Sequence, residues 1–460
     1  MKRIDVISYF PKLSRDVNIK PRPPWWWFVS DRQYLWPYKY GIQKWPVTVR
    51  IRIRDGKPVY LKTPDLAPLT AEIMFQGIFV EISDIEKPDK AFLRFKTFNM
   101  RNSQDFSLNY LPDSIQYSPG STILYLVRLS ELPLGKSTLN ITIKDSDNKE
   151  IGSLPLPITT KKPAYLKVTV RDEKGELTSA RVGVYSDGRF NYPPETLPLY
   201  PWDHKTAEGL NYDPTWPSKS KRVFYTRGTF KMAIRPGDVL LVIKKGIEYK
   251  RRKERFQIKA GETKKYPIQL ERYFNLPKEG WYSADDHVHV YRDGKNNEDI
   301  LEWAKAEDIH FASILQMGDI TREYYLQYAW GDKGTYSQGD YFIRSGQENP
   351  RTHERGHILM INNARSHWDP SMYYVYEKAL DLTHRDGGVN GYAHNGTIFK
   401  AERGLAIDAP LGKSDFIEVD ANHMKALYDW WNLGFKQTVA LGSDYPYAEW
   451  FGNRNFFVYV

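Results

Sequence analysis

The sequence predicts a multidomain protein in which N-terminal β-sandwich domains precede an α/β domain with a parallel sheet or barrel. The chain has 460 residues, enough for about three domains of ~150 residues each. Up to about residue 270, short segments alternate apolar and polar residues between turn signals, as the strands of a β-sandwich do. From Gly280 onward, apolar strands alternate with helical segments, which favours a parallel sheet.

Changes of composition divide the chain into four segments. Residues 1–48 are rich in proline, tryptophan and tyrosine and sustain no regular period, so we expect an extended aromatic arm. Residues 49–163 form a predicted β-sandwich, which ends in a linker at Lys161-Lys162-Pro163. Residues 164–272 form a second predicted β-sandwich, whose first strand begins at Tyr165. Residues 273–460 form the predicted α/β domain.

Within the α/β domain, the pattern of apolar residues predicts the elements in turn. A helix over 297–308 carries its apolar residues on one face, and a second helix over 370–385 is stopped by Gly387-Gly388. A third helix over 424–433 has Gly434 just past its end. The predicted strands cover residues 309–315, 357–362, 389–394, 416–420 and 438–441.

Composition excludes several kinds of chemistry. The chain has no cysteine, so disulfides, thiolate zinc sites and cysteine nucleophiles are excluded. No apolar run reaches ~18 residues, so we expect no membrane span, and the N-terminus shows no signal peptide. Residues 281–460 carry 17 basic and 26 acidic residues, a balance of −9, and the whole chain carries +10, so residues 1–280 carry +19. The acidic part suits cations. The basic part suits an anionic surface, polymer or substrate, or is simply a solvated surface.

Nine of the ten histidines lie between His287 and His423, and several stand beside acidic or glycine residues at predicted strand ends. Side chains two apart on a strand point to the same face, so His287 and His289 can reach one ion. Such a pair alone is often structural, but two aspartates precede it here. Imidazoles and carboxylates that converge from strand ends are typical of a hydrolytic metal site. The metal-ligand candidates are His287, His289, Glu348, His357, His394 and Asp444.

The order of these motifs resembles a known family. Asp285-x-His287-x-His289, a Glu followed by Gly-His, then Ala-His and Gly-Ser-Asp resemble the PHP (polymerase and histidinol phosphatase) metal-dependent hydrolases across about residues 280–445. The segment that begins Gly280-Trp281-Tyr282 is most similar to the carbaryl-hydrolase (CehA/McbA) branch. Residues 164–272 resemble the transthyretin-like, carboxypeptidase-regulatory β-sandwich that often precedes this domain. The resemblance implies an α/β PHP-like domain, a distorted βα barrel.

The resemblance also implies a binuclear site. His287, His289 and Asp444 would hold one metal, and Glu348 would bridge to a second metal that His357 and His394 also hold. A third family site would need histidines where this chain has Asp293, the segment 318–320 and Pro446, so we expect two metals. The catalytic candidates are Asp319, which could equally be a ligand or a structural cap, and His423, which could bind the leaving group or be surface packing.

Further residues have two open interpretations. Arg322 and Lys400 could bind a substrate anion or belong to the surface. An aromatic insertion, which comprises Tyr324, Tyr325, Tyr328, Trp330, Tyr336 and Tyr341, could cover the metals as a lid and favour an apolar or ring-containing substrate, or could be core packing. We interpret four histidines as structural: His204, His310, His367 and His384.

These residues predict a hydrolase that uses a metal-activated water on an ester, carbamate, amide or phosphoester. Its nitrogen and oxygen ligands fit divalent transition metals, with zinc first and manganese or iron as alternatives. Activity should fall in acid as the histidines take up protons. The alternative is a degenerate PHP-like protein whose basic, aromatic β domains bind a polysaccharide or other polymer. We expect a small-molecule or polymer substrate and no nucleic acid, and the domain resemblance favours a periplasmic or secreted protein; the sequence does not predict the oligomeric state.

Overall fold

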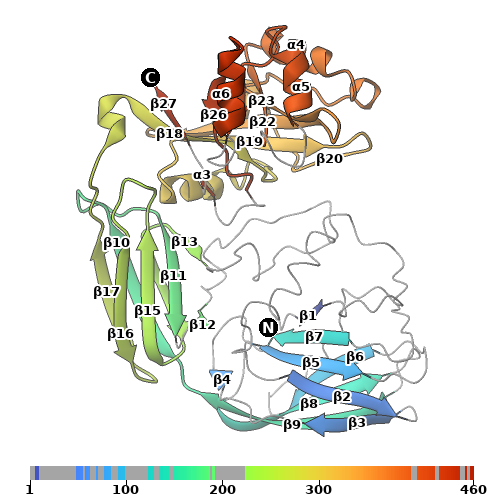
Figure 1. Ribbon diagram of the computed structural model, residues 1–460. Coiled ribbons are helices and arrows are strands. Elements are labelled where there is room, and N and C mark those ends of the chain that lie inside the picture. The colour runs from blue at the N-terminus through green and yellow to red at the C-terminus, as the bar shows by residue number, and fades with distance from the viewer. Residues whose placement is uncertain are drawn as a thin grey trace.

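The computed structural model describes residues 6–9, 48–54, 57–62, 69–70, 77–83, 92–98, 123–128, 134–144, 150–186, 189–191, 223–394, 401–419, 424–445, 451–452 and 456–460 (Figure 1). Of the predicted aromatic arm, the structure describes β1 (Val6–Tyr9), which pairs with β7, and Thr48, where β2 begins. His204, Lys400, His423 and Pro446 lie outside them as well.

The described residues of the first β region form strands in two sheets, as the alternating segments predicted. One sheet has the order β1-β7-β5-β2-β3, and the other has the order β4-β9-β8-β6. Their bounds are β2 (Thr48–Arg54), β3 (Lys57–Lys62), β4 (Leu69–Thr70), β5 (Gly77–Ser83), β6 (Phe92–Phe98), β7 (Ile123–Arg128), β8 (Gly135–Lys144) and β9 (Glu150–Lys161).

Two further sheets make up the second β region, which we call the small β domain. One has the order β14-β10-β17, and the other contains β12-β11-β15-β16 with β13 paired to β11. Inward-facing residues of both sheets, such as Leu166, Val182 and Leu241, form one apolar core. The strands are β10 (Ala164–Arg171), β11 (Ala180–Ser186), β12 (Arg189–Phe190), β13 (Phe224–Thr226), β14 (Thr229–Ile234), β15 (Gly237–Lys244), β16 (Arg252–Ile258) and β17 (Thr263–Gln269).

The C-terminal region is built on one ten-stranded sheet with the main order β26-β25-β24-β23-β22-β19-β18-β27. Its strands are β18 (Trp281–Val288), β19 (Phe311–Gly318), β20 (Glu323–Tyr324), β21 (Thr335–Gln338), β22 (Tyr341–Thr352), β23 (Gly356–Ile361), β24 (Val389–Tyr392), β25 (Phe416–Glu418), β26 (Thr438–Ala440) and β27 (Phe456–Tyr459). Short 3-10 helices cover η2 (Leu276–Glu279), η3 (Gly331–Gly334) and η4 (Pro370–Met372), and the α-helices are α3 (Asn297–Ala306), α4 (Tyr376–Arg385), α5 (Ala401–Asp408) and α6 (Met424–Asn432).

The sequence predicted a parallel sheet or barrel, and the observed sheet is mixed. β18, β19 and β22 run parallel, as do β24, β25 and β26. β23 is antiparallel to both its neighbours because β22 returns directly into β23 through a short turn between Thr352 and Gly356, with no helix between them. Parallel neighbours need a crossover, whereas antiparallel neighbours can be joined by such a turn.

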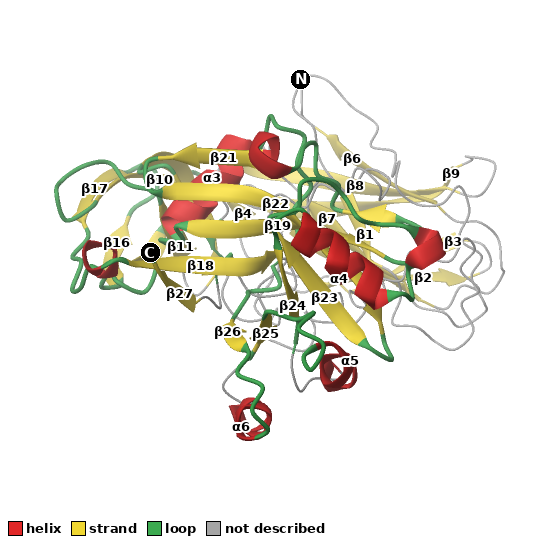
Figure 2. Cartoon of the chain, turned by 90° about the horizontal axis from the view of Figure 1, so that it is seen from above, coloured by secondary structure: helices red, strands yellow, loops and turns green. Residues whose placement is uncertain are grey.

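The two ends of the sheet approach each other, so the sheet is nearly closed, like a barrel. Beyond β26 the chain returns to β18, where Tyr445 pairs with Val288 in parallel and the backbone N–H of His289 donates to the carbonyl of Tyr445 at 2.6 Å. In Figure 2 the strands β18, β19 and β22 run side by side, and β23 to β25 turn away from them. This curvature brings the carboxyl ends of β18 and β26 together.

Helices flank the sheet on both sides (Figure 1). α3 packs on β21 and β22 and also contacts β11 and β13 of the small β domain. α4 and α5 pack on β23 and β24. The predicted helix over 370–385 is interrupted: only α4 is α-helical, and Tyr373 lies between it and η4 with its hydroxyl donating to the carbonyl of Gly318 at 3.1 Å. α5 was not predicted. Within the described residues, no helix has the length and apolarity needed to cross a membrane.

Candidate metal centre

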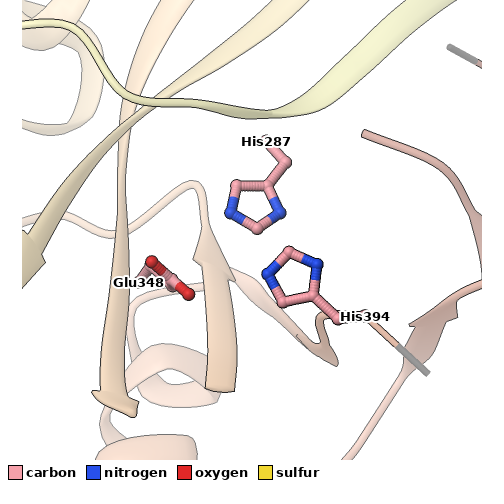
Figure 3. A group of neighbouring side chains, drawn as sticks. All are labelled: His287, Glu348 and His394. Atoms are coloured by element: carbon pink, nitrogen blue, oxygen red, sulfur yellow. The ribbon is translucent and has the colours of Figure 1, made fainter. Parts of the chain in front are cut away.

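The six predicted ligands stand on five elements of the nearly closed sheet. His287 lies near the end of β18 and His289 directly follows that strand, whereas Glu348 lies on β22 and His357 on β23. His394 follows β24, and Asp444 follows β26. Figure 3 shows the side chains of His287, Glu348 and His394 pointing toward one another from three separate segments. The fold therefore gathers residues that are up to 157 positions apart in the chain, from 287 to 444.

Two groups of ligand atoms lie close enough to hold a metal ion. In one, an atom from each of His287, His289 and Asp444 lies within 4.8 Å of the others. In the second, the same holds for His287, Glu348 and His394. His287 thus belongs to both groups, whereas the resemblance assigned it to the first metal alone. His357, which the resemblance assigned to the second metal, belongs to neither group.

His287 and His289 each use Nδ1 for a hydrogen bond, so Nε2 of each ring faces the site. Nδ1 of His287 lies 3.0 Å from Oε1 of Glu418, and Nδ1 of His289 lies 3.2 Å from the carbonyl oxygen of Leu315. Both partners are acceptors, so the rings donate through Nδ1. Their Nε2 atoms lie 3.0 Å apart and 3.4 and 3.5 Å from Oδ1 of Asp444. Two neutral imidazoles in this arrangement direct lone pairs at each other, an arrangement that requires a shared cation or a proton.

Glu418 contacts two of the candidate ligands, and the sequence did not reveal it. Its second oxygen, Oε2, accepts a hydrogen bond from the backbone N–H of His394 at 3.0 Å, so one carboxylate holds two ligands in place. A carboxylate that accepts from the outer nitrogen of a metal-bound histidine fixes the tautomer and orientation of the ring. Its strand, Phe416-Ile417-Glu418, carries no histidine or glycine signal.

Glu348 lies between the two ligand groups. Its Oε2 lies 3.3 Å from Nε2 of His289, and its Oε1 lies 2.6 Å from Nδ1 of His357. Arg351 lies 3.6 Å from the same carboxylate. Burial raises the pKa of Glu348, but the charge of Arg351 and hydrogen bonds from His289 and His357 outweigh burial and hold the pKa well below its usual value. The group is therefore an ionised carboxylate with one oxygen toward each histidine.

The electrostatic field of the site favours cations. Burial lowers the pKa of His287, but Glu418 and Asp444 outweigh it and hold the pKa well above the usual value. The pKa of His289 is likewise raised by Asp444 and Glu348 against the effect of burial. Burial opposes ionisation of Asp444 too, but the nearby histidines lower its pKa to about 2. Burial dominates at His357 and lowers its pKa to about 4, so this ring is neutral near pH 7.

The backbone at the rim of the site is strained at two ligands. His394 has a φ of 56° and Asp444 a φ of 51°. Both values lie in the left-handed region that residues other than glycine rarely adopt. Gly442, two residues before Asp444, allows close packing: a Cβ there would lie 2.1 Å from Cβ of His287 and 2.6 Å from Oε1 of Glu418. Strain and close approach of this kind concentrate at functional sites.

Asp285, which precedes the histidine pair, binds backbone rather than facing the ligands. Oδ1 accepts from the backbone N–H groups of Ser443 and His287, at 2.9 and 3.2 Å, and Oδ2 accepts from Gly452 at 3.1 Å. Burial raises its pKa to about 6. Asp285 therefore ties the end of β18 to the loop that carries Asp444.

Of the two catalytic candidates, the structure describes only Asp319, and it does not bring that residue into this site. Asp319 accepts hydrogen bonds from Thr321, from the backbone of Arg322 and from the Tyr324 hydroxyl, so its carboxylate caps a local turn. Arg322 donates to the Tyr324 hydroxyl at 2.6 Å within the same turn. Among the described residues, neither Asp319 nor Asp293 belongs to a potential metal group. His423, Lys400 and Pro446 lie outside the described residues, so nothing places them.

Three of the histidines interpreted as structural have local partners. His310 lies 2.9 Å from the Ser283 hydroxyl, and His367 and His384 each lie 2.8 Å from an aspartate, Asp386 and Asp415. None of the three belongs to a metal-capable group among the described residues.

Some residues of the aromatic insertion pack in the core, and one contacts the candidate site. Tyr336 and Tyr341 pack against the apolar core under α3, as the core interpretation expected. Tyr325 instead stacks on His289 with ring centroids 5.4 Å apart, at a φ of 53°. Tyr328 is exposed. Tyr325 is thus in ring contact with a candidate metal ligand.

Comparisons with known proteins add no functional information. No family model matches the chain, and no curated protein matches it. Among solved structures, PsfC from Pseudomonas syringae is 14% identical, with a TM-score of 0.25, and the alignment covers 36% of this chain and 76% of PsfC. The Bacillus anthracis TIE protein is 14% identical, with 45% and 37% covered and a TM-score of 0.17. The RrgB pilus protein of Streptococcus pneumoniae is 10% identical, with 50% and 47% covered and a TM-score of 0.16. At these scores the likenesses support no conclusion on fold or function.

Proposed function

We propose that this protein is a metal-dependent hydrolase of the PHP type, similar to the carbaryl-hydrolase (CehA/McbA) branch, that cleaves an ester, carbamate, amide or phosphoester. The nearly closed sheet, with all six candidate ligands on its strands or directly after strand ends, supports the assignment of the C-terminal region to a distorted, PHP-like βα barrel. The motif order along the chain supports it independently.

One observation carries the proposal: two imidazole Nε2 atoms and an Asp444 carboxylate oxygen converge within 3.0–3.5 Å of one another in a buried site. Three nitrogen and oxygen donors that converge in this way are the protein ligand set of a catalytic zinc ion. Orientation of both rings through Nδ1 is the arrangement that prepares histidines for metal binding.

The candidate ligands suit two divalent ions. His287, His289 and Asp444 would hold one. Glu348 and His394 would hold the other, with His357 beside them at 2.6 Å from Oε1 of Glu348, and the two oxygens of Glu348 suit a bridging role. Bound there, the ions would supply an activated water and polarise the substrate oxygen that gains charge. Zinc, manganese and iron all accept this donor set.

The protein's own residues restrict the approach of substrate. The side chains of Asp444 and His394 are 29% and 14% exposed, whereas those of His287 and His289 are at most 1% exposed. Substrate would therefore enter from the side of Asp444 and His394. Tyr325, which covers His289, would keep water from that face of the ring.

The experiment compares Glu348→Gln with His394→Ala, measured as metal content after purification without chelator and as hydrolysis of phenyl esters, naphthyl carbamates and phosphoesters. Glu348→Gln should lower the content of both ions, because the amide cannot bridge as a carboxylate does. His394→Ala should empty mainly one. His384→Ala, in a partly exposed pair with Asp415, is the control that should change neither. A wild-type protein that binds no metal and hydrolyses none of these substrates would contradict the proposal.

The alternative function is a degenerate hydrolase fold whose basic β domains bind a polymer. It leaves the convergence of five candidate ligands without a purpose, so we propose the hydrolase first. A protein that holds its metals but cleaves none of these substrates would favour the alternative.

A further inference from the structure

One sheet of the small β domain, β14-β10-β17, has no acidic residue on its strands. The three strands of the sheet β14-β10-β17 contain five basic residues and no acidic residue in their sequences AYLKVTVR, TFKMAI and TKKYPIQ. Their buried positions alternate with exposed ones, so every large aliphatic side chain points into the core. The outward positions hold lysines, threonines, an arginine, a tyrosine, an alanine, a proline and a glutamine.

Three of the lysines stand in a single row across the strands. Lys167, on the central strand β10, is the register partner of Lys231 on β14 and of Lys265 on β17. All three are exposed. Neighbouring strands lie about 4.8 Å apart, so the row places three positive charges over roughly 10 Å. We call these three residues the lysine row.

Folding alone does not explain the lysine row. Like charges directly opposite each other on neighbouring strands destabilise a sheet. Among the described residues, no carboxylate lies within ion-pairing distance of Lys167, Lys231 or Lys265. The ammonium of Lys231 lies 5.3 Å from the centre of the Tyr165 ring, a contact that keeps it on this face. A row that costs stability and has no internal counter-charge fits an external anion.

We propose that the lysine row binds an acidic polysaccharide laid across the strands of this face. Three hydroxyl side chains, Thr169, Thr229 and Thr263, lie on the same exposed side and can bind sugar hydroxyls, while the ammonium groups bind carboxylates or sulfates. Charge complementarity of this kind raises both the rate and the specificity of association. The inference does not depend on the proposed hydrolase activity.

Two other polyanions fit this face less well. A membrane surface is held most firmly where apolar side chains also insert, and the row has no large aliphatic neighbour facing outward. Single-stranded nucleic acid stacks its bases on aromatic rings. On the three strands, Tyr165 is the one outward aromatic residue, and Lys231 already lies over it.

The test uses the full chain and a triple variant, Lys167→Gln, Lys231→Gln and Lys265→Gln. Binding to polygalacturonate and to heparin should weaken by about tenfold or more, and its salt dependence should become shallower, because three ionic contacts are lost. The melting temperature should stay the same or rise, because like-charge repulsion is removed. A neutral dextran should bind neither protein.

The matched control is a second triple variant, Lys253→Gln, Arg255→Gln and Lys259→Gln, which removes the same charge from exposed positions on β16 and the turn after it. It should bind polygalacturonate as the wild type does. Equal weakening by both variants would show that only overall charge matters and would overturn the proposal. Capture of single-stranded DNA or phosphatidylserine vesicles, with no capture of either polysaccharide, would overturn it as well.

Discussion

The small β domain and the C-terminal sheet differ in whether their strands bury ionisable side chains. In the small β domain, every second residue of strand β10 is buried and the residues between are partly or fully exposed; the buried ones are all apolar: Ala164, Leu166, Val168 and Val170. At the end of β18, by contrast, Asp285, Asp286 and His287 are all fully buried in succession. Burial of ionisable groups costs several kcal/mol each unless they are paired or bind a metal. Burial of apolar residues, as in β10, is what folding requires. Burial of ionisable residues, as in β18, is typical of a functional site.

The difference extends to the backbone. Every positive-φ residue described in the small β domain is a glycine, such as Gly175 and Gly228. In the C-terminal region, His394 and Asp444 adopt positive φ, at a cost of roughly 1–2 kcal/mol for each residue. Strain carried by candidate ligands indicates that the region trades stability for the placement of these two side chains.

The largest expected effect is at the buried histidines. His287→Ala together with His289→Ala should abolish hydrolysis and lower the metal content from about two ions per chain. Loss of an outer partner alone costs about 10–100-fold in metal affinity, so loss of two ligands should exceed that. Metal analysis and the substrate panel described above measure both. A double variant that keeps its full metal content would show that these histidines are buried for another reason.

The next effect concerns the contact between the two regions. Arg181 of β11 lies 3.2 Å from Glu307, which follows α3, and their side chains are 5% and 3% exposed. Burial raises the pKa of Glu307, and Arg181 opposes this rise. Arg181→Ala removes the ion-pair partner of a buried acid, although Lys244, Lys245 and the Tyr225 hydroxyl still favour its charge, and should cost about 3 kcal/mol in the free energy of unfolding.

The same interface supplies a matched control for this change. Arg227 contacts Glu298 and Asp299 of α3 at 2.5 and 2.6 Å, but its side chain is 44% exposed. Arg227→Ala should therefore cost no more than about 1 kcal/mol. Urea unfolding of both variants gives the comparison. Equal losses would mean that burial does not set the strength of this interface.

Sequence patterns predicted the small β domain better than the C-terminal sheet, for a physical reason. Alternation along one strand reports which face is buried, and the predicted strand at Tyr165 is confirmed as β10. The direction of β23 depends instead on a turn between strands, and periodicity within a strand does not contain that information. α5 escaped prediction because it is a short helix that contains Gly404.

The candidate site shows the same limit. Motifs named six ligands because histidines and aspartates beside glycine are visible in a single segment. Glu418 was missed because its role comes from the pairing of β25 with β24 and β26, which places it beside His287 and His394. Asp319 sits at a strand end like a site residue, but it closes its own turn.

Glu418 offers a smaller and sharper test of the site. Glu418→Gln keeps the shape of the side chain but removes the charge that orients His287, and it should weaken metal binding by about 10–100-fold. Competition with a chelator, measured as the chelator concentration that halves activity, separates this from loss of a ligand. Full activity at saturating metal is expected to return, because the six ligands remain. A variant that never regains activity would assign Glu418 a role in the reaction itself.

The smallest effect is a pH dependence of stability at His310, which is 4% exposed at the start of β19, away from the candidate ligands. Its ring stacks on Tyr341 with centroids 4.7 Å apart and contacts Ser283. Burial lowers the pKa of His310, and Asp308 only partly opposes this. Since the folded protein holds the proton less tightly than the unfolded chain, whose histidines have a pKa near ~6.5, the contribution of the neutral ring is complete above that pH. This contribution to stability is lost as the pH falls below the histidine pKa of the unfolded chain.

His310→Asn keeps a hydrogen-bonding group beside Ser283 but cannot titrate. The variant should lose less stability than the wild type between about pH 7.5 and 5.5, a range that brackets the reference histidine pKa. Urea unfolding at both pH values measures this, and the difference between the two proteins isolates His310 from the candidate ligands, which both proteins share. An equally steep loss in both proteins would mean that His310 takes up its proton as readily in the folded state as in the unfolded chain, and that burial at this contact between β18 and β19 does not govern its charge.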